Sequence, residues 1–259
     1  MDTHITTGIS QLLKISLFPL TPLQARIDPP SPVHGWLLER ALQTLRQDGL
    51  VDTALFFSSF QAELNNGLLW ADKGWKNFSH YCQAEHKYWP RASHEAEGYY
   101  AKGLNTFDKN VPKTFFYLGA TLHIIQDMTV PHHAAGVLKD GHQEFESWVM
   151  MHWNDLGPSQ HGCYRAYQKP SEWIRYSVSL AKPYLPLVSL SHGATVSSFT
   201  EAARFLVPLS IRVSAGFLVM AHAALRQLPI EISNETLLQK SELTSIHYVT
   251  AKMVKRSVK

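Results

Sequence analysis

Two pairs of metal-ligating side chains repeat one spacing in this chain. His123 and Asp127 are four residues apart, and so are His142 and Glu146. Residues i and i+4 of an α-helix lie on the same face one turn apart, so each pair would present an imidazole beside a carboxylate. The sequence Pro-His-His lies between the pairs. Imidazole nitrogen and carboxylate oxygen are the ligands that zinc takes in sites without cysteine, so the pattern predicts a metal site.

A purely structural interpretation stands beside this one. A single His-x-x-x-Asp pair is usually a hydrogen bond on a helix face, and the histidines of a helical core protein can bind nothing. Two such pairs with histidines between them strengthen the case for a metal site, and on these residues alone both interpretations stay open. The chain also contains 14 histidines in 259 residues, a high content that suits several metal ions.

The composition limits the class of protein. Hydrophobic residues make up 45% of the chain, enough for a sizeable core. The formal charge is +3, and the scattered lysines and arginines form no stripe of the kind that binds nucleic acid. We expect no transmembrane segment, because the most apolar stretch, Phe205 to Leu225, is interrupted by Pro208, Arg212 and His222 and is interpreted as a core helix.

We divide the chain into three parts. Residues 1–32 form an N-terminal extension or a poor signal-like segment, since Asp2 stands where a basic cluster is usual and Lys14 interrupts the apolar run. Residues 33–227 form the folded domain, and residues 228–259 form a polar tail. Cys82 and Cys163 have no zinc-finger spacing, and either a disulfide or two free thiols fit the sequence.

The hydrophobic spacing is helical throughout, with no persistent strand-like alternation. Helices are expected near Pro32–Gln47, Val51–Trp70, Ala92–Phe107, Lys113–Met128, Glu144–Trp153, Ser171–Lys182 and Ser198–Gln227. Ser171 is expected to cap its helix, and Pro208 to kink or divide the last one. The fold class is therefore predicted to be all-α, a single compact domain of about seven to nine helices.

The central stretch resembles the signature of the bacterial zinc-dependent phospholipase C family. The segment FFYLGATLHIIQDMTVPHHAAG, beginning at Phe115, matches that family's helix with His and Asp one turn apart, followed by Pro-x-His-Ala-Ala, and the later His-x-x-x-Glu matches too. The resemblance covers about residues 33–226. Its other parts are the helix with His34, Glu63–Asp72, Phe78–His80, Pro170–Ile174 and Arg212–Gly216.

The resemblance implies a set of zinc ligands and a fold of the zinc phospholipase C type. One zinc would take Asp72, His80, His123 and Asp127, a second His133, His142 and Glu146, and a third Asp127 and His34. His133 is preferred to His132, which would be a supporting contact or a residue at the lip of the site. Asp72 would be catalytic, orienting the attacking water or taking its proton.

The chain departs from the family in two ways. The family completes its third zinc site with an N-terminal tryptophan, and no tryptophan precedes His34, so two or three zinc ions are expected. The loop between Asp72 and His80 is short, which leaves the head-group preference open. The aromatic residues nearby are either walls for a choline-type head group or part of the core. They include Trp70, Trp75 and Tyr81.

The implied function is hydrolysis of a glycerophospholipid at a membrane surface, which yields diacylglycerol and a phosphorylated head group. A monomeric protein is expected. The family implies a secreted or extracytoplasmic location, but the signal peptide is poor, and a cytoplasmic location is the alternative. The alternatives are a single-strand nuclease of the same superfamily and a non-catalytic zinc-binding homologue. Glu146, where the nucleases carry Asp, and the short interval between His133 and His142 favour the phospholipase, as does the absence of a basic patch.

Overall fold

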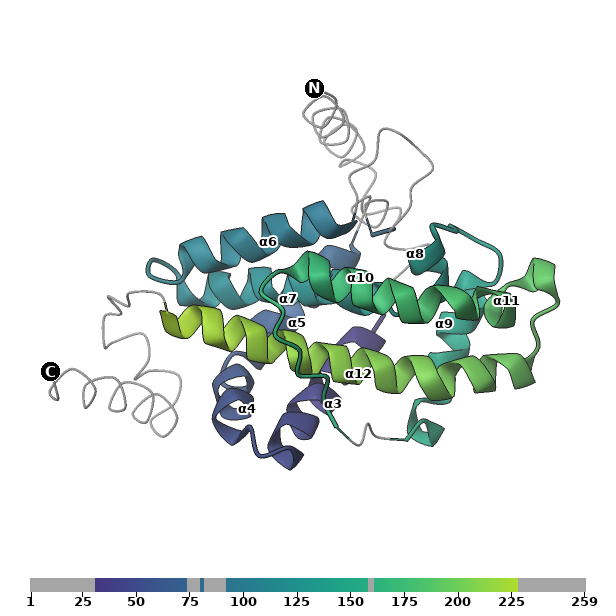
Figure 1. The fold of residues 1–259 in the computed structure, drawn as a ribbon, viewed down its shortest axis with the longest axis horizontal. Coiled ribbons are helices and arrows are strands. Elements are labelled where there is room, and N and C mark those ends of the chain that lie inside the picture. Colours follow the sequence, from purple (N-terminus) through teal and green to yellow (C-terminus); the bar gives the residue numbers. More distant parts are fainter. Residues whose placement is uncertain (1–30, 74–79, 82–91, 158–160, 228–259) are drawn as a thin grey trace, which may run out of the picture.

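The computed structural model of the chain describes residues 31–73, 80–81, 92–157 and 161–227, and these residues form helices without a strand among them (Figure 1). The helices are α3 (Val33–Gln47), α4 (Val51–Ser58), α5 (Gln61–Asp72), α6 (Ala92–Thr106), α7 (Val111–Asp127), α8 (Pro131–Ala135), α9 (His142–Met151), α10 (Pro170–Ala181), α11 (Leu185–Val188) and α12 (Val196–Gln227). The all-α prediction is confirmed. The expected tail, residues 228–259, and the first 30 residues of the expected extension, residues 1–32, lie outside the described residues.

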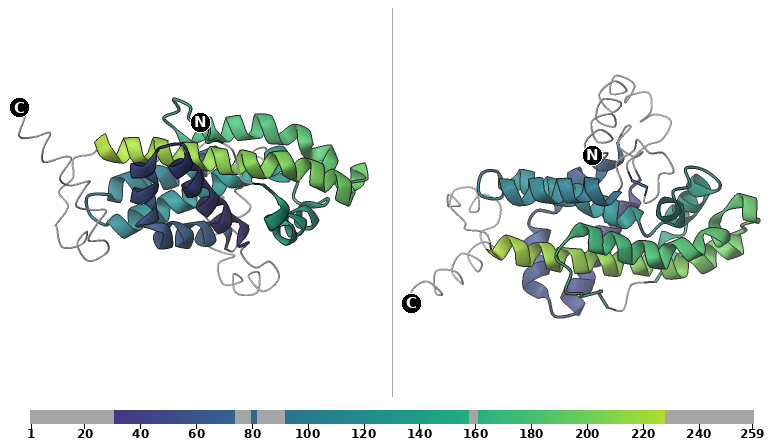
Figure 2. Two further views of the ribbon diagram at one scale, coloured as in Figure 1. Left: turned by 90° about the horizontal axis from the view of Figure 1, so that it is seen from below. Right: turned by 45° about the horizontal axis from the view of Figure 1, so that its top comes forward.

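The long helix α12 runs the length of the molecule, and α10 lies beside it in the views of Figures 1 and 2. α12 packs against α3, α7 and α10, and α7 in turn packs against α5 and α6. α7 is therefore enclosed on several sides, and nearly all of its residues after Phe115 are buried. Polar side chains near the C-terminal end of α7 are therefore held inside the protein.

The backbones of α5 and α7 touch where two glycines face each other's helices. A Cβ atom at Gly119 would lie 2.1 Å from the carbonyl oxygen of Leu64, and one at Gly67 would lie 1.9 Å from that of Phe116. Only glycine permits this approach, because the obstacle is backbone that cannot move without shifting a helix. This contact sets the position of α7 relative to α5, which ends at Asp72.

α12 is long and apolar enough to cross a membrane by length and composition, but 78% of its most apolar 18-residue window is buried inside the protein. The interpretation of this stretch as a core helix is thus supported. Pro208 lies inside α12, and the helix continues through it as one element.

Several helix boundaries differ from those expected. The helix expected over residues 51–70 is divided, since α4 ends at Ser58 and α5 begins at Gln61. Ser171 is not a cap: α10 begins at Pro170, and the carboxylate of Glu172 accepts the backbone N–H of Lys169 at 3.0 Å. A carboxylate in the first turn satisfies the unpaired N–H groups there as well as a serine would.

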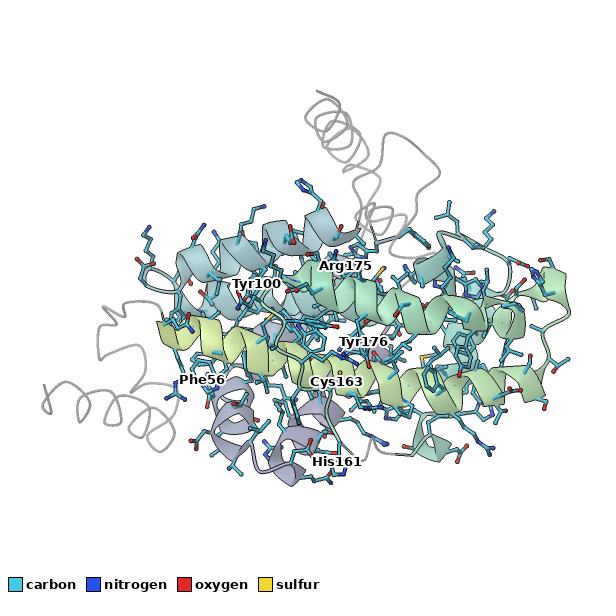
Figure 3. All side chains as sticks on the ribbon, in the orientation of Figure 1. Phe56, Tyr100, His161, Cys163, Arg175 and Tyr176 are labelled. Carbon is cyan, nitrogen blue, oxygen red and sulfur yellow. The ribbon has the colours of Figure 1, made fainter. Side chains whose placement is uncertain are left out.

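Cys163 is buried in the segment that crosses α12, where Figure 3 labels it, and among the described residues it forms no disulfide. Its backbone N–H donates to the carbonyl of Arg212 at 3.0 Å, which ties this segment to α12. Cys82 lies outside the described residues, so the pairing of the two cysteines stays open.

A buried histidine far from the predicted metal ligands joins α4 to α12. His222 is 5% exposed, its Nδ1 lies 2.8 Å from the hydroxyl oxygen of Thr53, and its ring stacks on Phe56 at 4.6 Å (Figure 3 labels Phe56). Burial, and then the charge of Arg226, lower the pKa of His222 from 6.5 to about 4, against a weaker opposing effect of Asp52.

We therefore expect His222 to make the protein less stable as the pH falls. Between pH 6.5 and about 4 the unfolded chain binds a proton at this histidine that the folded protein excludes, so the free energy of unfolding decreases with falling pH. Urea denaturation of wild type and His222→Gln at several pH values measures this. The difference in stability between the two proteins should shift in favour of the variant as the pH drops through that window. A constant difference would contradict the expectation.

Candidate metal centre

α7 carries the first pair of predicted ligands at its C-terminal end. The helix begins after Asn110, whose side chain accepts the backbone N–H of Lys113 at 3.0 Å, and Pro112 stands in its first turn. Its last two turns hold His123 and Asp127, which are 1% and 3% exposed. Nε2 of His123 lies 3.2 Å from Oδ2 of Asp127, the i,i+4 contact that the spacing predicted.

Four histidines converge on the Asp127 carboxylate. Nδ1 of His80 lies 3.0 Å from Oδ2, Nε2 of His34 lies 3.5 Å from Oδ1, and Nδ1 of His133 lies 4.0 Å from Oδ2. One donor atom each from His34, His123 and Asp127 lie within 4.8 Å of one another. We call these three residues with His80 the Asp127 group. Helices α3 and α7 supply three of its members, and His80 comes from the segment after α5.

The second group consists of His133, His142 and Glu146, whose donor atoms also lie within 4.8 Å of one another; we call it the Glu146 group. Nε2 of His142 lies 2.9 Å from Oε1 of Glu146, and Nε2 of His133 lies 3.9 Å from that oxygen. α9 begins at His142, directly after Gly141 with its positive φ of 97°, so the second i,i+4 pair occupies the first turns of that helix. His133 faces both carboxylates and makes the two groups neighbours.

Both carboxylates are held in their charged form. Burial opposes ionisation of Asp127, but the electrostatic effects of the His123 and His133 rings and hydrogen bonds from His123 and His80 keep its pKa well below the usual value. Burial likewise opposes ionisation of Glu146, and the charge and hydrogen bond of His142 lower its pKa to about 2. The site therefore offers two anionic ligands at neutral pH.

The hydrogen bonds of His133 show that the site suits a cation. Its Nδ1 donates to the carbonyl oxygen of His80 at 2.8 Å, so Nε2 is the nitrogen with the lone pair. Burial lowers the pKa of His133 to about 4 against the opposing effect of Asp127, so no second proton is held at neutral pH. The lone pair of Nε2 thus faces the Glu146 oxygen, acceptor against acceptor. A metal ion between them would satisfy both, and neutral imidazole with carboxylate is the donor set of zinc.

Two further rings support the Glu146 group. Tyr81 stacks on His133 with ring centroids 4.5 Å apart, and His132 stacks on His142 at 5.1 Å. His132 is fully buried, and its Nε2 donates to the carbonyl oxygen of Asp140 at 3.1 Å. Of the two roles considered for His132, the structure therefore favours a supporting contact over a residue at the lip.

Two of the remaining predicted site residues, Asp72 and Trp70, are not members of either ligand group among the described residues. Asp72, the last residue of α5, accepts the backbone N–H of Ser31 at 2.8 Å. Trp70 packs on Tyr99 and Phe116, with centroids 5.5 and 5.3 Å away, which is a core environment. Trp75 lies outside the described residues. A head-group role for Trp70, Trp75 or Tyr81 stays a prediction.

An apolar cavity of about 60 Å³ adjoins both groups. Its lining includes His34 from one group and Glu146 from the other, together with Phe145 of α9 and Leu206 and Val207 of α12. One residue of each group thus borders a common space with apolar walls, where charges interact more strongly than in water.

Sequence reasoning missed one polar residue of the site. Gln126 precedes Asp127 and is 1% exposed, with its side chain beside His34. The only sequence signal was a glutamine directly before a predicted ligand, in a helix whose neighbouring residues are apolar.

The chain is similar to known phospholipases in sequence. Residues 33–188, more than half of the chain, match the sequence model of a family described as zinc dependent phospholipase C. A phospholipase C of Bacillus cereus is 26% identical over 171 residues, which span 58% of this chain and 60% of that relative.

The chain is also similar in fold to solved structures. An alpha toxin from Clostridium absonum superposes with a TM-score of 0.62 at 17% identity, covering 73% of this chain and 62% of the toxin. The alpha-toxin of an avian strain of Clostridium perfringens gives a TM-score of 0.57 at 15% identity, covering 75% of this chain and 64% of that one. At these identities the superpositions show a shared helical fold. The resemblance drawn from the motif around His123 is confirmed by the sequence match, and the chain belongs to the zinc-dependent phospholipase C family.

Proposed function

We propose that this protein is a zinc-dependent phospholipase C, which hydrolyses a glycerophospholipid to diacylglycerol and a phosphorylated head group. The observation that carries the proposal is the pair of adjacent ligand groups, in which His133 faces both the Asp127 and the Glu146 carboxylates. Adjacent metal ions are the arrangement that stabilises both the attacking and the leaving oxygen in displacement at phosphorus. Membership of the family supports the same reaction.

The ligands of the proposed ions come from both groups. His80, His123 and Asp127, together with Asp72, would hold one zinc ion, the Glu146 group would hold a second, and His34 with Asp127 would hold a third. When bound, zinc supplies Lewis acidity, which stabilises negative charge on phosphate oxygens and lowers the pKa of a water nucleophile. Asp127 and Glu146 balance part of the positive charge, and the burial of Asp127, His80 and His123 excludes competing water from that end of the site.

Asp72 is the proposed catalytic base. It ends α5 and is tied to the start of α3 through the backbone of Ser31, so its carboxylate is fixed relative to the helix that carries His34. In this role Asp72 orients the attacking water or takes its proton. The substrate is a phospholipid presented at a membrane surface, and we propose that the protein acts as a secreted monomer.

The test is hydrolysis of phosphatidylcholine by the zinc-loaded chain. We expect release of phosphocholine, loss of activity with a chelator, and recovery on addition of zinc. His142→Ala should lower the rate about a thousand-fold or more, since it removes one ligand of the Glu146 group. His94→Ala is the control, because His94 is an exposed histidine on α6 outside both groups.

Other outcomes would identify the alternatives. Release of nucleotides from single-stranded DNA without phosphocholine would indicate the nuclease. Bound zinc with no turnover of phosphatidylcholine, phosphatidylethanolamine or DNA would indicate a non-catalytic zinc-binding protein.

A further inference from the structure

Gln126 is a buried polar residue that joins three helices at the edge of the Asp127 group. It is 1% exposed and lies on α7 directly before Asp127. Its carboxamide reaches His34 on α3, with Oε1 2.8 Å from Nδ1, and Ser214 on α12, with Nε2 3.2 Å from Oγ. A single side chain therefore connects the helix that carries His123 and Asp127 with two others.

The donor and acceptor roles in these hydrogen bonds determine the tautomer of His34. The carboxamide lies with Nε2 toward Ser214, where it donates to Oγ, and with Oε1 toward His34, where it can only accept. Nδ1 of His34 must then carry the proton. In a neutral imidazole this leaves the lone pair on Nε2, the nitrogen that lies 3.5 Å from Oδ1 of Asp127.

His34 needs such a fixed partner more than the other histidines of its group. Its side chain is 12% exposed, whereas those of His80 and His123 are 1% exposed. It stands in the first turn of α3, and its ring contacts that of His123, with centroids 4.1 Å apart. Without Gln126 the ring could turn, and either nitrogen could carry the proton.

We propose that Gln126 is a positioning residue for His34, which selects the Nδ1–H tautomer and aims Nε2 at a zinc ion shared with Asp127. The proposal rests on the metal centre of the proposed function. A hydrogen bond to the second nitrogen of a histidine ligand orients the imidazole ring and raises its basicity. Loss of this bond typically lowers metal affinity about 10- to 100-fold. Ser214 contributes by holding the carboxamide in the orientation that His34 requires.

The direct test is zinc affinity, measured by competition with a chromogenic chelator, for wild type and Gln126→Leu. Leucine fills a similar volume without either hydrogen bond. One zinc ion should bind about 10- to 100-fold more weakly, with the affinity of the others unchanged. Gln126→Glu keeps an acceptor oxygen for Nδ1 and should retain most of the affinity. Ser214→Ala, which removes only the anchor, should cause a smaller loss.

A double-mutant comparison separates positioning from a general effect on the fold. In a His34→Ala background, Gln126→Leu should cause no further loss of zinc affinity, because the residue through which it acts is gone. If Gln126→Leu lowered zinc affinity equally in the wild-type and the His34→Ala background, the proposal would be overturned. So would wild-type zinc affinity in Gln126→Leu.

The ring nitrogens of His34 provide a readout that needs no variant of Gln126. ¹⁵N NMR of the metal-free wild-type protein, with His34→Ala to assign the signal, should show the proton on Nδ1. A proton on Nε2 would overturn the proposal even if Gln126→Leu did not fold. Absence of bound zinc in the wild type would overturn the metal centre and this inference together, whereas zinc bound equally by wild type and Gln126→Leu would overturn this inference alone.

Discussion

Asp127→Asn is expected to release at least one zinc ion per chain and to lower phospholipid hydrolysis about a thousand-fold or more. Asparagine has nearly the same shape, so the fold should persist. It lacks the negative charge, and its amide group would lie among the imidazole nitrogens of His34, His80 and His123, which are 3.0 to 3.5 Å from the carboxylate oxygens. Elemental analysis and the rate of phosphocholine release measure the two effects.

The matched control is Asp108→Asn, since Asp108 is an exposed aspartate in the turn before α7. It should keep both zinc and activity. If Asp127→Asn bound as much zinc as the wild type, the Asp127 group would not be a metal site, and its convergence of side chains would be a buried hydrogen-bond network only.

Gly119→Ala should lower the free energy of unfolding by about 3 kcal/mol, at the upper end of the usual cost of overpacking. The added Cβ would lie 2.1 Å from the carbonyl oxygen of Leu64, so α5 and α7 must separate. Because Gly119 is one turn from His123, the same separation should weaken zinc binding. Urea denaturation of the metal-free protein measures the stability effect.

Gly98→Ala is the control for the helical glycine itself. Gly98 is exposed within α6, and a Cβ there would meet nothing within 4 Å. This variant should be more stable by about 0.5–1 kcal/mol, because alanine loses less backbone entropy than glycine in a helix. If Gly119→Ala and Gly98→Ala changed the free energy of unfolding by the same amount, the close approach of α5 and α7 would not require glycine at position 119.

The local part of the site could be predicted from the sequence because it depends on helix geometry. The i,i+4 spacing of His123 with Asp127 and of His142 with Glu146 is a property of one helix, and both contacts are present at 3.2 and 2.9 Å. The proximity of His34 and His80 to Asp127 depends on tertiary packing. It was predicted only through the resemblance to a known family.

Other features of the site could not be predicted, because they depend on contacts between distant segments that no local sequence pattern encodes. The carboxamide of Gln126 acquires its role only when α3 and α12 are placed beside α7. The stacking of Tyr81 on His133 likewise joins two distant segments. The cap of α10 was assigned to Ser171 because serine is a frequent cap, whereas the helix begins one residue earlier, at Pro170, and the carboxylate of Glu172 accepts the N–H groups of Gln168 and Lys169. The break between α4 and α5 near Ser59 was not predicted, because the apolar spacing continues across it.

The most direct measurement is the number of zinc ions per chain, by elemental analysis of protein purified without chelator. Two adjacent groups of imidazole and carboxylate ligands predict at least two zinc ions, and three if His34 and Asp127 hold one more. A chain that binds no zinc, and whose stability is unchanged by His123→Ala, would contradict the metal centre and with it the proposed phospholipase activity.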